Sequence, residues 1–183
     1  MGTSKQNGTA IEFRDVTAEN WPDLETLFES RGGPKACWCL VWRDYQRKGD
    51  KRALEEYVDA ATPVGILGYV EHEPVAWCSI APRSTYRSGL ADVLPGDEDE
   101  VVWSLVCFFV KRQHRGRGML RALLHAAEDQ AKSRGATVLE AYPVDSDSPS
   151  YRFGGFLKSF TREGYEAIGR AGTRRHVVRR RLR

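Results

Sequence analysis

The stretch that decides the fold reads VVWSLVCFFV over residues 101–110 and KRQHRGRGMLRALL over residues 111–124. The first ten residues are almost wholly apolar, which predicts a central strand buried on both faces. Leu120, Leu123 and Leu124 then recur at helical spacing and predict an amphipathic helix, which Gly135 ends. The sequence therefore places a strand, a basic glycine-containing turn and a helix directly after one another.

The turn between this strand and this helix has the features of an anion-binding site. The first turn of a helix leaves backbone N–H groups unpaired and carries a partial positive charge. Gly116 and Gly118 let the backbone approach a bulky anion, and basic side chains surround them: Lys111, Arg112, Arg115, Arg117 and Arg121. The glycine spacing fits neither a P-loop nor a dinucleotide-binding turn. We interpret the turn as a phosphate or pyrophosphate site; the alternative is a tight turn with solvated arginines.

Strands and helices alternate along the rest of the chain. Before the central strand, apolar spacing predicts a strand at residues 10–16, a helix between Asn20 and Arg31, a helix from about Asp50 and a hairpin over 66–81. After it, the pattern predicts a strand at 138–142, a short helix at 156–163 and strands at 165–169 and 174–182. We expect one α/β (α+β) domain over residues 10–183, preceded by a disordered tail at residues 1–9.

Composition excludes several classes of protein. With 183 residues, 41% of them apolar and 29% charged, the chain has the size and composition of one soluble domain. The longest apolar run has six residues, far short of a membrane span, and the N-terminus lacks the apolar core of a signal peptide. Four cysteines without an export signal predict reduced thiols in a cytoplasmic protein.

Residues 110–124 resemble the acyl-CoA-binding motif of the GNAT superfamily, the GCN-type N-acetyltransferases. That motif, Arg/Gln-x-x-Gly-x-Gly/Ala, follows an apolar strand end. Arg115 takes its first position and Gly118 its fourth, whereas Leu120 replaces the usual small residue at the sixth. A register beginning at Gln113 satisfies the formula literally but shortens the gap after the strand. The order of elements over residues 10–182 also agrees with the family.

The resemblance implies a GNAT-like mixed sheet of about six to seven strands with helices on both faces. The sheet would be splayed where the strand 101–110 parts from the strand 138–142, and the cosubstrate acetyl-CoA would enter this split. Main-chain groups would hold the pantetheine as an extra strand at Phe108, Phe109 and Val110. The pyrophosphate would be bound by the loop residues Arg115, Gly116, Arg117, Gly118, Met119 and Leu120.

The catalytic residues implied by the resemblance are incomplete. Acetyl transfer to an amine needs a base for the amine and an acid for the departing thiolate. Many family members carry a carboxylate or histidine where this chain has Trp103 and Ser104, and a tyrosine acid where it has Phe160. Glu140 and Glu100 are the nearest candidate bases, although Glu100 equally fits a solvated charge. Substitute acids are Tyr142, Tyr151 and Tyr165, of which the first two join Glu140 as the predicted catalytic residues.

Aromatic residues supply candidates for the acceptor side. In family members the segment after the first helix often forms the acceptor pocket, and here it contains Trp38 and Trp42. With Trp77 on the hairpin, these are the predicted substrate-binding residues, suited to an apolar or cationic amine. Packing in the core is the alternative. The nearby pair Cys37 and Cys39 lacks the four ligands of structural zinc, so no metal is predicted.

The sequence thus predicts an N-acetyltransferase that moves an acetyl group from acetyl-CoA to a primary amine. The acceptor would be a small molecule and the transfer direct, in a ternary complex, with the acidic segment 97–100 attracting a cation. A homodimer is compatible with the sequence, and no membrane partner is expected. One alternative is a non-catalytic CoA-binding sensor. Another is a nucleic-acid-binding module built on the arginines of residues 174–183, which the net charge of +3 disfavours.

Overall fold

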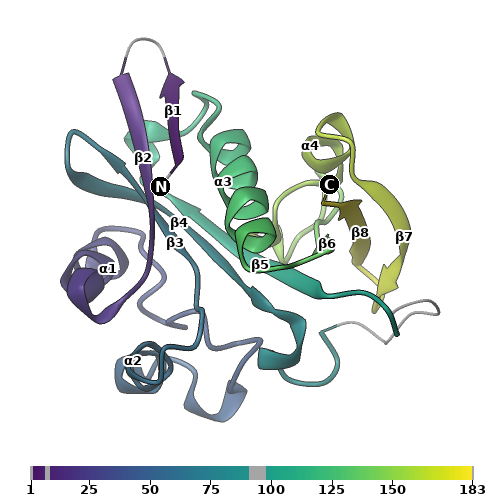
Figure 1. Cartoon of the computed structure of the whole chain (residues 1–183), viewed down its shortest axis with the longest axis horizontal. Helices are drawn as coiled ribbons and strands as arrows, with labels where there is room; N and C mark the ends of the chain where they lie inside the picture. The colour runs from purple at the N-terminus through teal and green to yellow at the C-terminus, as the bar shows by residue number, and fades with distance from the viewer. Residues whose placement is uncertain (1, 7–8, 91–97, 183) are drawn as a thin grey trace.

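A computed structural model describes residues 2–6, 9–90 and 98–182 of the chain. Its centre is an eight-stranded sheet in the order β1-β2-β3-β4-β5-β6-β8-β7 (Figure 1). The strands are β1 (Gly2–Gln6), β2 (Thr9–Asp15), β3 (Ile66–Val70), β4 (Glu73–Pro82), β5 (Val102–Val110), β6 (Val138–Ala141), β7 (Glu166–Ala171) and β8 (Arg175–Arg181). The helices are α1 (Trp21–Glu29), α2 (Lys51–Asp59), α3 (Met119–Ser133) and α4 (Leu157–Arg162). This architecture confirms the predicted mixed α/β fold.

The first strand, β1, lies where the sequence predicts a disordered tail. Gly2–Gln6 forms β1, which pairs antiparallel with β2 and makes the sheet one strand larger than the upper expectation of seven. Its residues are small or polar, so the sequence offers no apolar alternation that would predict a strand. An edge strand can form through backbone hydrogen bonds to its neighbour, which composition does not reveal.

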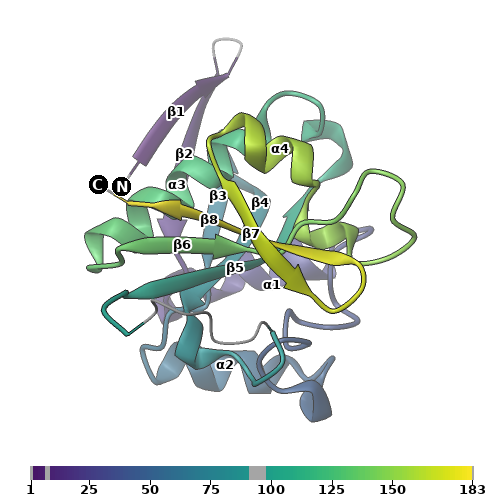
Figure 2. The ribbon, with the colours of Figure 1, turned by 90° about the vertical axis from the view of Figure 1, so that its right-hand side faces the viewer.

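Helices cover both faces of the sheet (Figures 1 and 2). On one face, α1 and α2 pack with the segment 38–42 against side chains such as Leu67, Trp77 and Val106. On the other face, α3 and α4 cover a second cluster that includes Cys78, Leu105 and Leu139. Both clusters follow from the sequence, because each helix carries one apolar stripe and β4 and β5 are apolar on both faces. No helix of the described residues is long and apolar enough to cross a membrane.

The sheet splits between β5 and β6, the only parallel neighbours among its described strands. Parallel pairing runs from Val102 opposite Val138 to Leu105 opposite Ala141 and stops there. From Val106 onward, β5 pairs with β4 alone among the strands that the structure describes. A β-bulge marks the same point: Ser79 lies opposite Cys107 and Ile80 opposite Leu105, which leaves Val106 as the extra residue. We call this point the fork, and it confirms the predicted splayed sheet.

Candidate functional site

The loop between β5 and α3 keeps its backbone open at the start of the helix. Gly116 and Gly118 have φ of 75° and 77°, in the left-handed region that favours glycine. The Nε of Arg115 donates to the carbonyl of Val110 at 2.8 Å and so closes the loop onto the strand end. The amide of Ala122 bonds Gly118 at 3.0 Å, and the helical amides before Ala122 have no intrahelical acceptor. This is the geometry that an anion site requires.

A pocket of about 200 Å³ opens beside this loop, between the start of α3 and α4. Its lining comes from both helices and comprises Gly118, Leu120, Arg121, Leu124, Ser159, Phe160, Arg162 and Glu163. The carboxylate of Glu163 lies 3.1 Å from Arg121 and 2.9 Å from His125. Desolvation raises the pKa of Glu163, but these two neighbours outweigh it and lower the pKa. Leu120, the residue that departs from the family motif, forms part of the wall.

A buried polar network lies at the fork. The carboxylate of Glu140 is fully buried, and Ser104 lies directly opposite it in the register of β5 and β6. The Tyr142 hydroxyl donates to Oε1 of Glu140 and lies 2.9 Å from the Ser104 hydroxyl. Oε2 of Glu140 accepts from Nε of Arg179 at 2.7 Å. The structure thus brings together the predicted residues Glu140 and Tyr142, and adds Arg179 from β8.

The electrostatics of this network favour a neutral Tyr142. Burial and then the neighbouring Glu140 carboxylate raise the pKa of Tyr142 well above its ordinary value. Giving up its proton would place a buried phenolate next to a buried carboxylate, which is unfavourable. Both oxygens of Glu140 accept hydrogen bonds within this network.

Tyr151, the third predicted catalytic residue, lies in a cluster of aromatic and guanidinium groups. Its ring centroid is 6.2 Å from that of Trp42. The Arg175 guanidinium carbon lies 4.2 Å from the Trp42 ring centre, 5.6 Å from that of Tyr151 and 5.9 Å from that of Tyr142. The side chain of Tyr151 is 36% exposed, whereas Tyr142 is buried. We call Trp42, Tyr151 and Arg175 the aromatic–arginine cluster; it lies beside Tyr142 at the fork.

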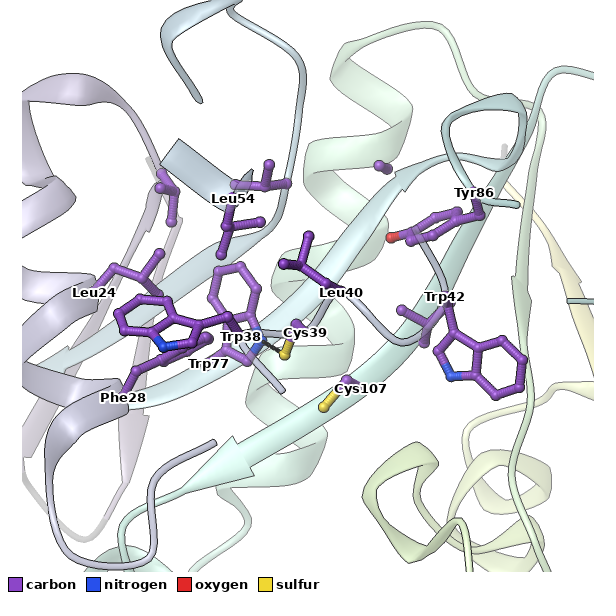
Figure 3. Packing of buried hydrophobic residues seen from close by; sticks show 14 of the residues in the cluster. Leu24, Phe28, Trp38, Cys39, Leu40, Trp42, Leu54, Trp77, Tyr86 and Cys107 are labelled. Carbon is purple, nitrogen blue, oxygen red and sulfur yellow. Dashed lines mark hydrogen bonds between the residues drawn. The ribbon is translucent and has the colours of Figure 1, made fainter. Parts of the chain in front are cut away.

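The other two predicted substrate-binding residues are core residues. Trp77 is fully buried, and its Nε1 donates to the Cys39 sulfur at 3.1 Å (Figure 3). Trp38 packs its ring 5.1 Å from that of Phe28 and is 4% exposed. Figure 3 shows both rings among the side chains of α1 and α2, while Trp42 lies apart from them. The structure therefore gives Trp38 and Trp77 a packing position and leaves Trp42 beside the fork.

The remaining candidate acid and base are engaged elsewhere. Tyr165 is buried against the other face and donates to Glu128 at 2.9 Å. Burial, followed by the Glu128 carboxylate, raises the pKa of Tyr165. The two oxygens of Glu100 pair with Arg179 at 3.1 Å and Arg181 at 2.9 Å. The acidic segment 97–100 thus has at least one charge that arginines neutralise; Asp97 lies outside the described residues.

The basic C-terminus is an inner strand with ion-paired arginines. The predicted strand at 174–182 is β8, which lies between β6 and β7. Arg179 pairs with Glu140 and Glu100, Arg180 with Glu128, and Arg181 with Glu100. Three of these arginines are therefore paired with carboxylates, which weakens the case for nucleic-acid binding.

The thiols do not form a metal site within the described part of the chain, where no cluster of histidine, cysteine and acidic residues suits a metal ion. All four cysteines are free thiols. Contact with the Cys107 thiol, together with burial, raises the pKa of Cys39, and burial does the same for Cys78. Such thiols stay protonated and unreactive at neutral pH.

Sequence reasoning missed Arg175 and Arg179 as parts of the site. Their partners are far away in sequence: Trp42 precedes Arg175 by more than a hundred residues. A signal did exist, because alternation along β8 puts Arg175 on the same face as Val177, which packs with α1 and α2. An arginine in phase with a buried valine is a candidate for an inward-facing charge.

Comparison with known proteins identifies relatives of this architecture. The model of the acetyltransferase (GNAT) family matches residues 21–154. None of the curated proteins matches the sequence. Among solved structures, a GNAT-family acetyltransferase from Listeria monocytogenes superposes with a TM-score of 0.64 at 12% identity, covering 99% of this chain and 100% of that one.

Two further solved structures are complexes with coenzyme A. PaiA N-acetyltransferase from Thermoplasma acidophilum has a TM-score of 0.59 at 11% identity, with 93% of this chain and 98% of that chain covered. N-acetylglutamate synthase from Neisseria gonorrhoeae, complexed with coenzyme A and N-acetyl-glutamate, has a TM-score of 0.56 at 14% identity, with 94% of this chain and 35% of that chain covered. At these identities the likeness establishes the fold.

Proposed function

Because this chain belongs to the acetyltransferase (GNAT) family, we propose that it moves the acetyl group of acetyl-CoA to a primary amine of a small molecule. Transfer is direct, within a ternary complex. The observation that carries this proposal is the fork, which has the α3–α4 pocket on one face and the aromatic–arginine cluster on the other. Two substrates that arrive from opposite faces meet at the fork without a covalent enzyme intermediate.

The cosubstrate side follows from backbone groups. The amides at the start of α3 would bind the pyrophosphate, with Gly116 and Gly118 leaving room for it. Arg115 acts by holding the loop on Val110, whereas the exposed Arg117 adds positive charge. The backbone of Phe108–Val110, which has no β6 partner, would pair with the pantetheine. The two coenzyme A complexes among the structural neighbours support acetyl-CoA as the cosubstrate.

The reaction forms a C–N bond, breaks the C–S bond and moves two protons. The neutral amine nitrogen attacks the thioester carbonyl carbon, the C–S bond breaks, the nitrogen releases a proton to solvent and the sulfur gains one. We assign the proton donor to Tyr151, because its side chain is exposed and the Arg175 charge, 5.6 Å from its ring, stabilises the phenolate that remains. Glu140 and Tyr142 are positioning residues that hold β6 against β5 and β8 at the fork.

The experiment that tests this function has two steps. Calorimetric titration of the purified protein with acetyl-CoA, against desulfo-CoA and ADP as controls, should give binding at micromolar strength. Release of free CoA thiol in the presence of a panel of primary amines should then show turnover. Absence of binding to any of the three ligands would refute the placement of the cosubstrate.

A second candidate function is a non-catalytic CoA-binding sensor. It is favoured by Phe160, a buried phenylalanine where many relatives carry the tyrosine acid, and by the full engagement of Glu140. Both candidates predict acetyl-CoA binding, but only the enzyme predicts accumulation of CoA thiol with an amine.

A further inference from the structure

Among the residues that the structure describes, Arg175 is a buried cation without a carboxylate partner. Its side chain belongs to a residue only 9% exposed, and its Nη1 donates to the carbonyl of Leu90 at 2.9 Å. Within residues 2–6, 9–90 and 98–182, its other two nitrogens have no hydrogen-bond acceptor and the residue forms no ion pair. Burying a charge is costly unless it is paired, so an unpaired arginine beside a reaction centre calls for an explanation.

Two other arginines show what a purely structural arginine looks like in this protein. Arg179, on the same strand, is ion-paired to Glu140 and Glu100. Arg43 is also buried, but its two terminal nitrogens donate to Thr85, Tyr86 and the carbonyls of Pro63 and Val64. Among the described residues, only one nitrogen of Arg175 donates a hydrogen bond, whereas two nitrogens do so in Arg43 and in Arg179.

A second guanidinium lies on the same tryptophan. The Arg87 guanidinium carbon is 5.1 Å from the Trp42 ring centre, and its Nε donates to the carbonyl of Val41 at 2.8 Å. Arg87 likewise has no carboxylate partner among the residues described. Burial lowers the pKa of Arg175, and the charge of Arg87 contributes in the same direction, against the neighbouring Tyr151 and Tyr142, which raise it. Two guanidiniums thus lie on one tryptophan ring.

This arrangement reverses the expected preference for a cationic acceptor. The aromatic face that would attract a cation is already covered by the chain's own guanidiniums, and a further positive charge would be repelled. A carboxylate would instead relieve the repulsion and receive hydrogen bonds from free guanidinium donors, the geometry in which arginine binds carboxylates.

We propose that Arg175, assisted by Arg87, binds a carboxylate of the acceptor, and that the acceptor is amino-acid-like, with its primary amine a few bonds from that carboxylate. The proposal rests on the proposed acetyltransfer at the fork. The Arg175 guanidinium carbon lies 5.9 Å from the ring centre of Tyr142, at the fork, and 5.6 Å from that of Tyr151, so one small molecule can reach from the fork to the guanidinium.

The first experiment compares matched acceptors. Thiol release is measured with α- and ω-amino acids, their amides and their decarboxylated amines, which differ only in the carboxylate. The free acid should have a kcat/KM roughly tenfold or more above that of its amide. Arg175→Gln should remove this preference, and Arg175→Lys should keep part of it. Equal use of acid and amide by the wild-type protein would overturn the proposal.

The matched control is Arg174→Gln. Arg174 is the neighbouring residue, is exposed and bonds the Ser150 hydroxyl at 3.0 Å, so its loss removes the same charge without touching the aromatic–arginine cluster. The acid-to-amide ratio should be unchanged in this variant. If Arg174→Gln lowered the ratio as much as Arg175→Gln, general surface charge would be responsible and the assignment of Arg175 would be wrong.

A binding experiment separates this inference from the proposed activity. The wild-type protein saturated with CoA is titrated with N-acetyl-amino acids and with their amides, followed by calorimetry. Tighter binding of the acids without turnover of any amine would support the carboxylate site and refute the enzyme. Turnover with equal binding of acids and amides would do the opposite. This comparison also decides the matter if Arg175→Gln fails to fold.

Discussion

Nε of Arg179 lies 2.7 Å from Oε2 of Glu140. The neighbouring strands β6 and β8 are therefore joined by a buried ion pair as well as by their backbone hydrogen bonds. Removing one partner of such a pair leaves an uncompensated buried charge, whose cost exceeds the net contribution of the intact pair.

The variant Glu140→Gln therefore tests whether Glu140 stabilises the fold rather than acting as the catalytic base. We expect the free energy of unfolding to fall by about 3 kcal/mol, because the charge of Arg179 loses its closest carboxylate. Urea denaturation measures this loss, and the pH profile of thiol release by the variant should keep its shape. A variant of unchanged stability whose profile loses its acidic limb would instead identify Glu140 as the base.

Tyr151→Phe should lower kcat about 100-fold, because the departing thiolate loses its proton donor. Its affinity for acetyl-CoA, measured by calorimetry, should stay the same. Tyr142→Phe is the comparison: it should cost about 1–3 kcal/mol of stability, since an oxygen of buried Glu140 loses its donor, with a smaller effect on kcat. The reverse ranking of the two kcat values would move the donor to Tyr142.

Gly118→Asp should abolish acetyl-CoA binding, because a negative charge would occupy the proposed pyrophosphate site. Gly135→Asp is the matched control: with φ of 83° against 77°, it carries the same backbone strain at the other end of α3. Both variants should lose similar thermal stability, and calorimetry should show that only Gly118→Asp loses acetyl-CoA. Loss of binding in both would mean that strain in α3, rather than the anion site, is responsible.

Trp77→Phe should lower the free energy of unfolding by about 1–3 kcal/mol through lost packing and the lost contact with Cys39. Its KM for the acceptor amine should not change, since the ring is buried in the core. Trp42→Phe should raise that KM, because the ring supports Arg175. Steady-state kinetics on both variants checks this, and an acceptor KM that rises only in Trp77→Phe would restore Trp77 to the acceptor site.

Local sequence patterns predicted most of the fold. The helix α3 begins at Met119, directly after the glycine-containing turn and before the first of the predicted leucines, because these local signals determine where it starts. The strand β1 was missed because Gly2–Gln6 carries no apolar alternation. The fork was predicted only from the resemblance to a family, because the sequence of residues 102–110 and 138–141 does not indicate where the pairing of the two strands ends.

The candidate site was less predictable, because its groups meet only in three dimensions. Glu140 and Tyr142 are two residues apart on one strand and were found together. Trp38, Trp42 and Trp77 share a residue type, and only the folded chain separates the two core rings from the one beside the fork. Arg175 was not predicted as a site residue, because its aromatic neighbours come from distant segments.

The bulge at Val106 decides which face of the sheet each later side chain of β5 points to. Val106 and Cys107 both face α1 and α2, so every later residue of β5 is displaced by one step: Phe109 faces that side, whereas Phe108 and Val110 face α3 and α4. If the same residues alternated strictly from Leu105 onward, with no bulge, these faces would be exchanged. Phe108 would then leave Phe160, its neighbour at 6.2 Å between ring centres. One inserted residue thus decides which aromatic ring stands on which side of the fork.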